Sequence, residues 1–452
     1  MKTTGARSGI IYFVLALLIG GMIWLVSNIV MNGNKFITMP YNGHIYDDDT
    51  PVQSGDVLDR NNLALVYDEN GRRVYSDDED IRKALLHTTG DYSGYIGTSI
   101  QSRLKAQLVG YNFITGLNDL PENPYMSGRD IKLTVDADLS KLAYQLLDGK
   151  NGAVLLSNYK TGEILVKVSA PTYDPMNIPE DLQENSIYSG VFVDNTISSS
   201  YTPGSIFKLV TAVSAIENLS DYQNVTCNCT GSLAVGDSRV TCLGKHGNIG
   251  MQEALGNSCN VYFAKIALEI GEDKLQQTAE SLGFNKSFSL PDFTTKESNI
   301  SLENSEDIEL AWAGVGQFTT TVNPANMLML MHAVANSGNA VPLRLTESGF
   351  FDEIANQEVQ LLSAETANNL KILMRAVVRD YYGDASFSNM NICAKTGTAE
   401  VGENKNPNAW IVGFSENEET PYAFSIVVED AESGMSVAGN IVKKLLAELS
   451  KK

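Results

Sequence analysis

Residues 201–210 read Tyr-Thr-Pro-Gly-Ser-Ile-Phe-Lys-Leu-Val, and the interpretation of the whole chain depends on them. Pro203 and Gly204 interrupt whatever precedes them, and an apolar helical pattern follows. Ser205 therefore falls at the N-terminus of a predicted helix, and Lys208 follows three residues later on the same face. A serine and a lysine in this relation can act as a nucleophile and its base, provided that a dry site lowers the pKa of the lysine.

A single Ser-x-x-Lys pattern proves little, because the chain contains a second one at Ser157-Asn-Tyr-Lys160. It also contains an additional Lys-Thr-Gly at 160–162 and an additional Ser-x-Asn at 337–339. Ser157 and Lys160 lie at the end of a predicted strand, where positions three apart point to opposite faces. Ser337 follows a predicted helix and is interpreted as part of a turn. None of these three additional motifs is expected to form a site.

Two further motifs follow Ser205 and Lys208 in a fixed order. Ser258-Cys-Asn260 lies in a loop between two predicted helices. In this interpretation Ser205 attacks a carbonyl and Lys208 takes its proton. Ser258 can relay that proton to a leaving amine, and Asn260 can hold the amide of the substrate.

The third motif is Lys395-Thr-Gly-Thr398, at the end of a predicted strand. Lys395 and the hydroxyls of Thr396 and Thr398 can bind a carboxylate. Gly397 lets an extended substrate lie against the edge of the strand. The backbone amides of Ser205 and Thr398 are predicted to form the oxyanion hole.

The three motifs in this order resemble those of the penicillin-binding, serine-acylating transpeptidases. The string Tyr201-Thr-Pro-Gly-Ser-Ile-Phe-Lys208 resembles the nucleophile motif of that family, and Gly55-Asp-Val-Leu-Asp-Arg-Asn61 resembles the N-terminal signature of its class B, monofunctional members. Other matching strings are Gly152-Ala-Val, Thr161-Gly-Glu-Ile-Leu, Ser169-Ala-Pro-Thr-Tyr-Asp-Pro175, His246-Gly247, Gly314-Val-Gly-Gln317, Asn323-Pro-Ala325 and Trp410-Ile-Val-Gly-Phe414. Ser54 stands where class B members usually carry arginine, and the N-terminal domain is short. Together these features suggest a compact class B member similar to the penicillin-binding protein A group, with division, elongation and sporulation roles all left open.

The resemblance implies a peptidoglycan D,D-transpeptidase that needs no cofactor or metal. Its substrates would be stem peptides, β-lactam antibiotics would acylate Ser205 and be released slowly, and a multi-spanning glycan polymerase would be its membrane partner. The alternatives are a β-lactamase or D,D-carboxypeptidase of the same fold, or a β-lactam sensor or catalytically idle scaffold. A scaffold would be expected to lose Ser205, Lys208 or Lys395, and all three are present.

The order of predicted elements indicates an α+β fold. Strands, then helices, then strands and a final helix fit an antiparallel sheet with helices on both faces. We expect a cytoplasmic tip at 1–8, a single transmembrane anchor at 9–31, a small N-terminal domain at 32–148 and a transpeptidase domain at 149–452.

The predicted anchor is an uncharged apolar run from Gly9 to Met31, about the length that crosses a bilayer. Lys2 and Arg7 precede it, so the N-terminus is expected in the cytoplasm and the catalytic domain outside. A cleaved signal peptide is the alternative, but the run is longer than a typical signal core. The net charge of −21 argues against nucleic acid as a partner, because such a chain repels phosphates.

The five cysteines are Cys227, Cys229, Cys242, Cys259 and Cys393. Cys242 could form a disulfide with Cys229 or with Cys227, or all five could be reduced, and the sequence leaves these alternatives open. The four histidines are scattered, and we expect none at ligand spacing from a cysteine, no zinc site and no catalytic cysteine. Cys259 is interpreted as a small residue facing the core.

Overall fold

A computed structural model of the protein describes residues 11–27, 54–69, 72–109, 111–112, 116–117, 128–347, 357–402 and 406–451. Its centre is a five-stranded antiparallel sheet in the order β15-β16-β17-β7-β8. The strands span Ile392–Ala399, Asn408–Ser415, Tyr422–Val428, Gly152–Asn158 and Ile164–Ala170, in that order. Strands thus precede and follow the helices of this domain, and a helix ends it, in the predicted order.

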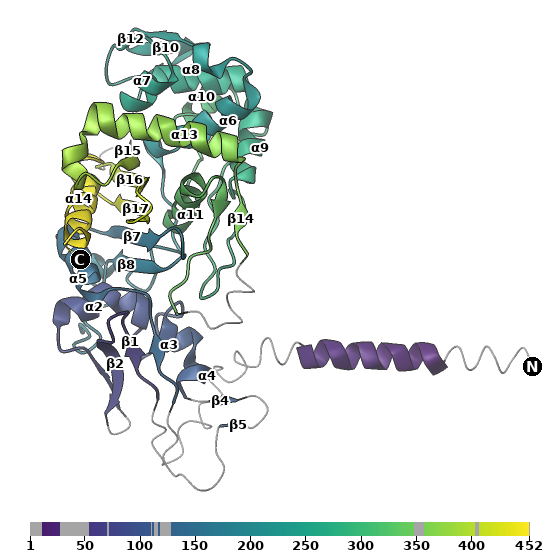
Figure 1. Ribbon diagram of the computed structural model, residues 1–452, viewed down its shortest axis with the longest axis vertical. Coiled ribbons are helices and arrows are strands. Elements are labelled where there is room, and N and C mark those ends of the chain that lie inside the picture. Colours follow the sequence, from purple (N-terminus) through teal and green to yellow (C-terminus); the bar gives the residue numbers. More distant parts are fainter. Residues whose placement is uncertain are drawn as a thin grey trace, which may run out of the picture.

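Helices cover both faces of this sheet, and every residue of the inner strand β16 is accordingly buried. On one side α5 (Ala137–Leu147) packs against β8, and α14 (Ala438–Leu449) packs against β16 and β17. On the other side α11 (Pro324–Ala335) packs against the same two strands, and α13 (Ala364–Val377) packs against β15 (Figure 1). The predicted fold class is confirmed.

A lobe rich in helices lies beyond α13 and carries the chain between the nucleophile motif and α11 (Figure 1). Its helices are α6 (Lys208–Asn218), α7 (Met251–Gly256), α8 (Asn260–Ile270), α9 (Glu272–Ser281) and α10 (Asp307–Ala313). The sequence pattern does not predict the four short strands that interrupt these helices. They are β9 (Cys227–Cys229), β10 (Ser232–Val235), β11 (Ser238–Thr241) and β12 (Gly247–Ile249), paired as β9–β12 and β10–β11.

A smaller four-stranded sheet precedes the main one, in the order β3-β2-β1-β6. It contains β1 (Val57–Leu58), β2 (Ala64–Glu69), β3 (Arg72–Tyr75) and β6 (Ile131–Lys132). β1 pairs with β2 in antiparallel orientation, with Val57 opposite Val66. Helix α2 (Glu79–Thr89) joins this sheet to the larger domain, because it contacts β2, α5 and β8.

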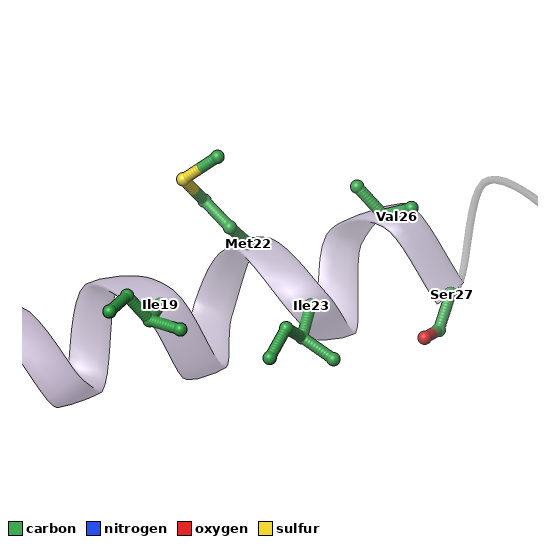
Figure 2. A pocket seen from close by; sticks show the side chains of 5 residues that line it. All are labelled: Ile19, Met22, Ile23, Val26 and Ser27. Carbon is green, nitrogen blue, oxygen red and sulfur yellow. The ribbon is translucent and has the colours of Figure 1, made fainter.

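Residues 11–27 form a separate helix that projects from the body of the molecule (Figure 1). Figure 2 shows Ile19, Met22, Ile23 and Val26 standing out from it, and these four side chains are 49–62% exposed. Within the described residues, no helix is both long enough and apolar enough to cross a membrane. The ends of the predicted anchor, at 9–10 and 28–31, lie outside the described residues.

Candidate active site

The nucleophile lies in a turn rather than inside the first turn of a helix. Residues Gly204–Ile206 form a 3-10 turn, and α6 begins at Lys208. The α-helix therefore begins three residues later than predicted, although Ser205 and Lys208 still share one face. Gly204 has a φ of +54°, and a Cβ there would lie 2.9 Å from the carbonyl oxygen of Thr398. Only glycine allows the nucleophile turn to approach β15 this closely.

Lys208 connects the first two motifs. Its Nζ lies 2.8 Å from Ser205 Oγ, 3.2 Å from Ser258 Oγ and 2.9 Å from the carbonyl oxygen of Ser258. The Oδ1 of Asn260 accepts a hydrogen bond from the same nitrogen at 2.8 Å. The structure thus brings together Ser205, Lys208, Ser258 and Asn260 as the sequence predicts.

The electrostatics of the site suit a lysine that acts as a base. Lys208 has no exposed surface, and burial lowers its pKa from 10.5 to about 7, although nearby Cys242 and Cys259 raise it. At neutral pH a large fraction of the amine is therefore unprotonated. An unprotonated amine 2.8 Å from a serine hydroxyl can accept its proton during attack on a carbonyl.

A second buried lysine approaches from the opposite side. The Nζ of Lys395 lies 3.1 Å from Ser258 Oγ and donates to the carbonyl of Thr396 at 2.8 Å. Burial and the neighbouring ammonium of Lys208 hold the pKa of Lys395 well below its usual value. Ser258 Oγ thus bridges two amines that compete for protons, which is the position that a proton relay requires.

The third motif forms one side of this centre. Residues 395–398 lie toward the C-terminal end of β15, which extends one residue further, and β15 is an edge strand of the sheet. Thr398 is exposed and Thr396 is partly exposed, so both hydroxyls are accessible. A Cβ on Gly397 would lie 2.8 Å from the carbonyl oxygen of Pro203, which explains why no side chain fits between β15 and the nucleophile turn. An extended peptide could add to β15 as a further strand.

The residues of the additional motifs have other partners in the structure. Ser157 is buried in the core, where its Oγ lies 2.7 Å from Nε2 of His332. Lys160 is half-exposed and pairs with Glu418 instead. Ser337 has a φ of +53° in the turn after α11, as its interpretation as a turn residue requires.

Sequence analysis missed two residues that hold the motifs in place. The hydroxyl of Tyr382 lies 2.9 Å from Thr396 Oγ1 and accepts the backbone N–H of Thr396 at 3.2 Å. Trp410, quoted above only within a matching string, donates its indole N–H to the carbonyl of Thr202 at 3.0 Å. A tyrosine at the end of a helix carries no sequence signal for such a role. Trp410 does, because it lies in the matching string after the third motif.

The cysteines differ from expectation. All five are unpaired in the structure, and Cys242 forms a disulfide with neither Cys229 nor Cys227. Cys242 Sγ and His246 Nδ1 lie 3.7 Å apart, and both approach Cys229 and Cys259. The expectation that no histidine lies at ligand spacing from a cysteine is therefore wrong. The missed signal is the spacing of four residues between Cys242 and His246, with a further cysteine thirteen residues away on each side. Cys259 is fully buried, as predicted.

Comparison with known proteins agrees with this geometry. Residues 152–447 match the family model of the penicillin-binding protein transpeptidase domain. The peptidoglycan D,D-transpeptidase PbpA of Mycolicibacterium smegmatis is 26% identical over 450 residues, which covers 88% of each chain. A D,D-transpeptidase domain from Eggerthella lenta is 26% identical with a TM-score of 0.74, over 88% of this chain and 99% of that one.

Penicillin-binding protein A of M. tuberculosis, solved as a ceftriaxone acyl-enzyme complex, has the same fold. Its TM-score is 0.74 at 22% identity, over 90% of this chain and all of that one. The matched family domain contains all three motifs, which meet at Lys208 and Ser258. The chain therefore belongs to the penicillin-binding protein transpeptidase family, as a class B member similar to the PbpA group.

Proposed function

We propose that this protein cross-links peptidoglycan as a serine-type D,D-transpeptidase and is acylated by β-lactams. One observation carries the proposal: the buried amine of Lys208 lies 2.8 Å from Ser205 Oγ and is held there by Ser258 and Asn260. The relatives named as peptidoglycan D,D-transpeptidases and the β-lactam acyl-enzyme of a structural relative support it.

The reaction follows from the contacts. Neutral Lys208 takes the proton of Ser205 Oγ as that oxygen attacks the carbonyl between the two terminal D-alanines of a stem peptide. The backbone amides of Ser205 and Thr398 stabilise the oxyanion in this proposal. The proton then passes from Lys208 through the hydroxyl of Ser258 to the departing D-alanine amine. An acyl-enzyme remains on Ser205.

The acceptor amine of a second stem peptide then attacks the acyl-enzyme, and the same groups act in reverse. Lys395, with the hydroxyls of Thr396 and Thr398, binds the terminal carboxylate of the donor. A carboxylate beside Lys395 favours its charged form, which in turn favours neutral Lys208 because two buried ammonium groups repel each other. Asn260 holds the substrate amide beside Lys208.

The experiment is covalent labelling of the full chain with a fluorescent penicillin. Wild-type protein is expected to carry label that persists for many minutes, and Ser205→Ala is expected to carry none. Ser157→Ala is the matched control, because it removes the serine of the additional motif. Absence of label on folded wild-type protein would defeat the proposal.

Product analysis separates transpeptidation from hydrolysis. A stem peptide ending in D-Ala-D-Ala, supplied with an acceptor amine, is expected to give the new amide. Hydrolysis alone would indicate a carboxypeptidase, and loss of the penicillin label within seconds would indicate a β-lactamase.

The proposal includes a single N-terminal membrane anchor at 9–31, with the N-terminus cytoplasmic and the catalytic domain outside. Its support is the uncharged run in the sequence and the exposed apolar side chains of the helix at 11–27. Carbonate extraction of membranes tests it: the full chain is expected to stay in the pellet, and release into the supernatant would contradict the anchor.

The domain division at 148/149 and a multi-spanning glycan polymerase partner in the membrane are also proposed. The family match, which begins at residue 152, supports the division. The resemblance to class B proteins supports the partner, which would contact the anchor and the N-terminal domain. Crosslinking in the membrane followed by mass spectrometry is expected to recover such a polymerase, and deletion of residues 1–31 should abolish the crosslink.

A further inference from the structure

Four side chains with metal-binding atoms converge in the lobe beside the active site. They are Cys229, Cys242, His246 and Cys259, and their ligand atoms all lie within 4.8 Å of one another. Each comes from a different position in the lobe: the end of β9, the residue after β11, the residue before β12 and the N-cap of α8. The pairing of Gly247 with Cys229 places His246 beside Cys229.

The distances fit a tetrahedral site. A zinc ion bound at about 2.3 Å by sulfur and about 2.0 Å by nitrogen has ligand separations of about 3.8 Å between sulfurs and about 3.6 Å between sulfur and nitrogen. Cys242 Sγ lies 3.9 Å from Cys259 Sγ and 3.7 Å from His246 Nδ1. A disulfide needs its sulfurs at about 2.05 Å, so Cys242 and Cys259 are not placed for one.

The strands that carry the cluster are short and lie outside the main sheet. The strands β9–β12 and β10–β11 form two separate two-stranded sheets, and such pairs are marginally stable alone. In the loop between Cys242 and His246, the Leu243 side chain is fully exposed and contributes nothing to a core. Cys229 and Cys259 are buried, so the cluster lies under this loop rather than on the surface.

From this arrangement we infer that Cys229, Cys242, His246 and Cys259 bind one Zn²⁺ ion as a structural site. Three thiolates and one neutral imidazole complete a tetrahedron, and each cysteine releases its proton when the metal binds. Thiolate and imidazole ligands suit zinc and do not suit Mg²⁺ or Ca²⁺. With four protein ligands the site is closed, so the metal takes no part in the acyl transfer.

The site has a consequence for catalysis, because Cys259 lies between Ser258 and Asn260. Ser258 has a φ of +53°, a backbone conformation that a serine rarely adopts. Both residues that follow it in the motif are constrained. Cys259 is one of the proposed metal ligands, and Asn260 donates a hydrogen bond to the carbonyl of Thr241, the residue before Cys242. A metal that fixes Cys259 and Cys242 thus fixes the two groups that hold Lys208.

Metal analysis of the purified full chain tests the site directly. Wild-type protein is expected to contain one zinc ion per chain. Cys229→Ser, Cys242→Ser and His246→Asn are each expected to lose it. The matched controls are Cys227→Ser and Cys393→Ser, which remove buried cysteines outside the cluster and should retain the metal.

X-ray absorption on the wild-type protein provides a readout that does not depend on any variant folding. Three sulfurs at about 2.3 Å and one nitrogen at about 2.0 Å are expected. A metal-free protein with five titratable thiols, a protein with a disulfide and three thiols, or zinc bound only by oxygen and nitrogen would each overturn the inference.

The link to catalysis is measured separately from the metal content. Removal of zinc with a chelator is expected to slow acylation by β-lactam about tenfold or more, and added Zn²⁺ but not Mg²⁺ should restore it. An unchanged rate in the metal-free protein would refute the positioning role. Failure of zinc-loaded wild-type protein to be acylated would instead refute the proposed function and leave the metal site standing.

Discussion

The pH dependence of acylation is the sharpest test of Lys208 as the base. With a pKa of about 7, about 9% of this lysine is neutral at pH 6 and about 91% at pH 8. The second-order rate of acylation should therefore rise about tenfold between pH 6 and pH 8 and then level off. A lysine with the ordinary pKa of 10.5 would give a hundredfold rise over the same interval, with no plateau.

The assay is stopped-flow or quenched labelling with a penicillin, whose carboxylate does not titrate in this range. Lys208→Ala, with its fold intact, should lose acylation and with it the bend near pH 7, whereas Lys160→Ala, which removes the lysine of the additional motif, should keep the wild-type profile. Thermal unfolding at each pH shows that the protein stays folded. A rate that rises with unit slope through pH 9, or acylation retained in Lys208→Ala near neutral pH, would refute the reasoning.

Three further predictions test the contacts around the site. Gly397→Val should abolish acylation while the chain still folds, because its Cβ would lie 2.8 Å from the Pro203 carbonyl oxygen; labelling at the wild-type rate would contradict this contact. Trp410→Phe should lower the free energy of unfolding by about 1 kcal/mol and slow acylation severalfold, since it removes the hydrogen bond to Thr202; urea unfolding and labelling measure both. Lys208→Met should unfold at a higher urea concentration than wild type at pH 7. The difference in free energy of unfolding should shrink by about 2 kcal/mol by pH 9, because the unfolded wild-type chain binds more protons than the folded one in that window and wild-type stability therefore rises with pH. An advantage that does not change with pH would mean that the pKa of Lys208 is not lowered.

Local patterns were sufficient for most of the fold. The bounds of α5 and α11 agree with the apolar periodicity and with their capping residues, Asp136 and Asn323, whose side chains accept backbone N–H groups. The strands β7 and β17 are continuous apolar runs that the sequence shows plainly. The nucleophile turn differs by a few residues, because Gly204 adopts a positive φ that no periodicity reveals.

The short strands of the lobe could not be predicted from local sequence patterns. Three residues of β9 and three of β12 give no period to detect, and they pair only because the chain between them folds back. The convergence of Cys229 with Cys259, thirty residues apart, depends on that pairing. Tyr382 likewise meets Thr396 only because the helix before β15 ends in one wider turn at 378–382. Contacts of this kind are set by tertiary structure.

The position of Ser258 explains why the nucleophile motif has no meaning by itself. Ser157 and Lys160 have the same spacing as Ser205 and Lys208, yet Ser157 pairs with His332 in the core and Lys160 pairs with Glu418 instead. In the proposed mechanism Lys208 acts as a base because Ser258 and Asn260 keep a dry amine hydrogen-bonded, and because Lys395 approaches Ser258 from the other side. A proton taken from Ser205 then has one short path toward a leaving amine. The proposed mechanism therefore depends on the loop at 258–260 as much as on the serine, and a contact that fixes this loop is expected to affect the rate of acylation.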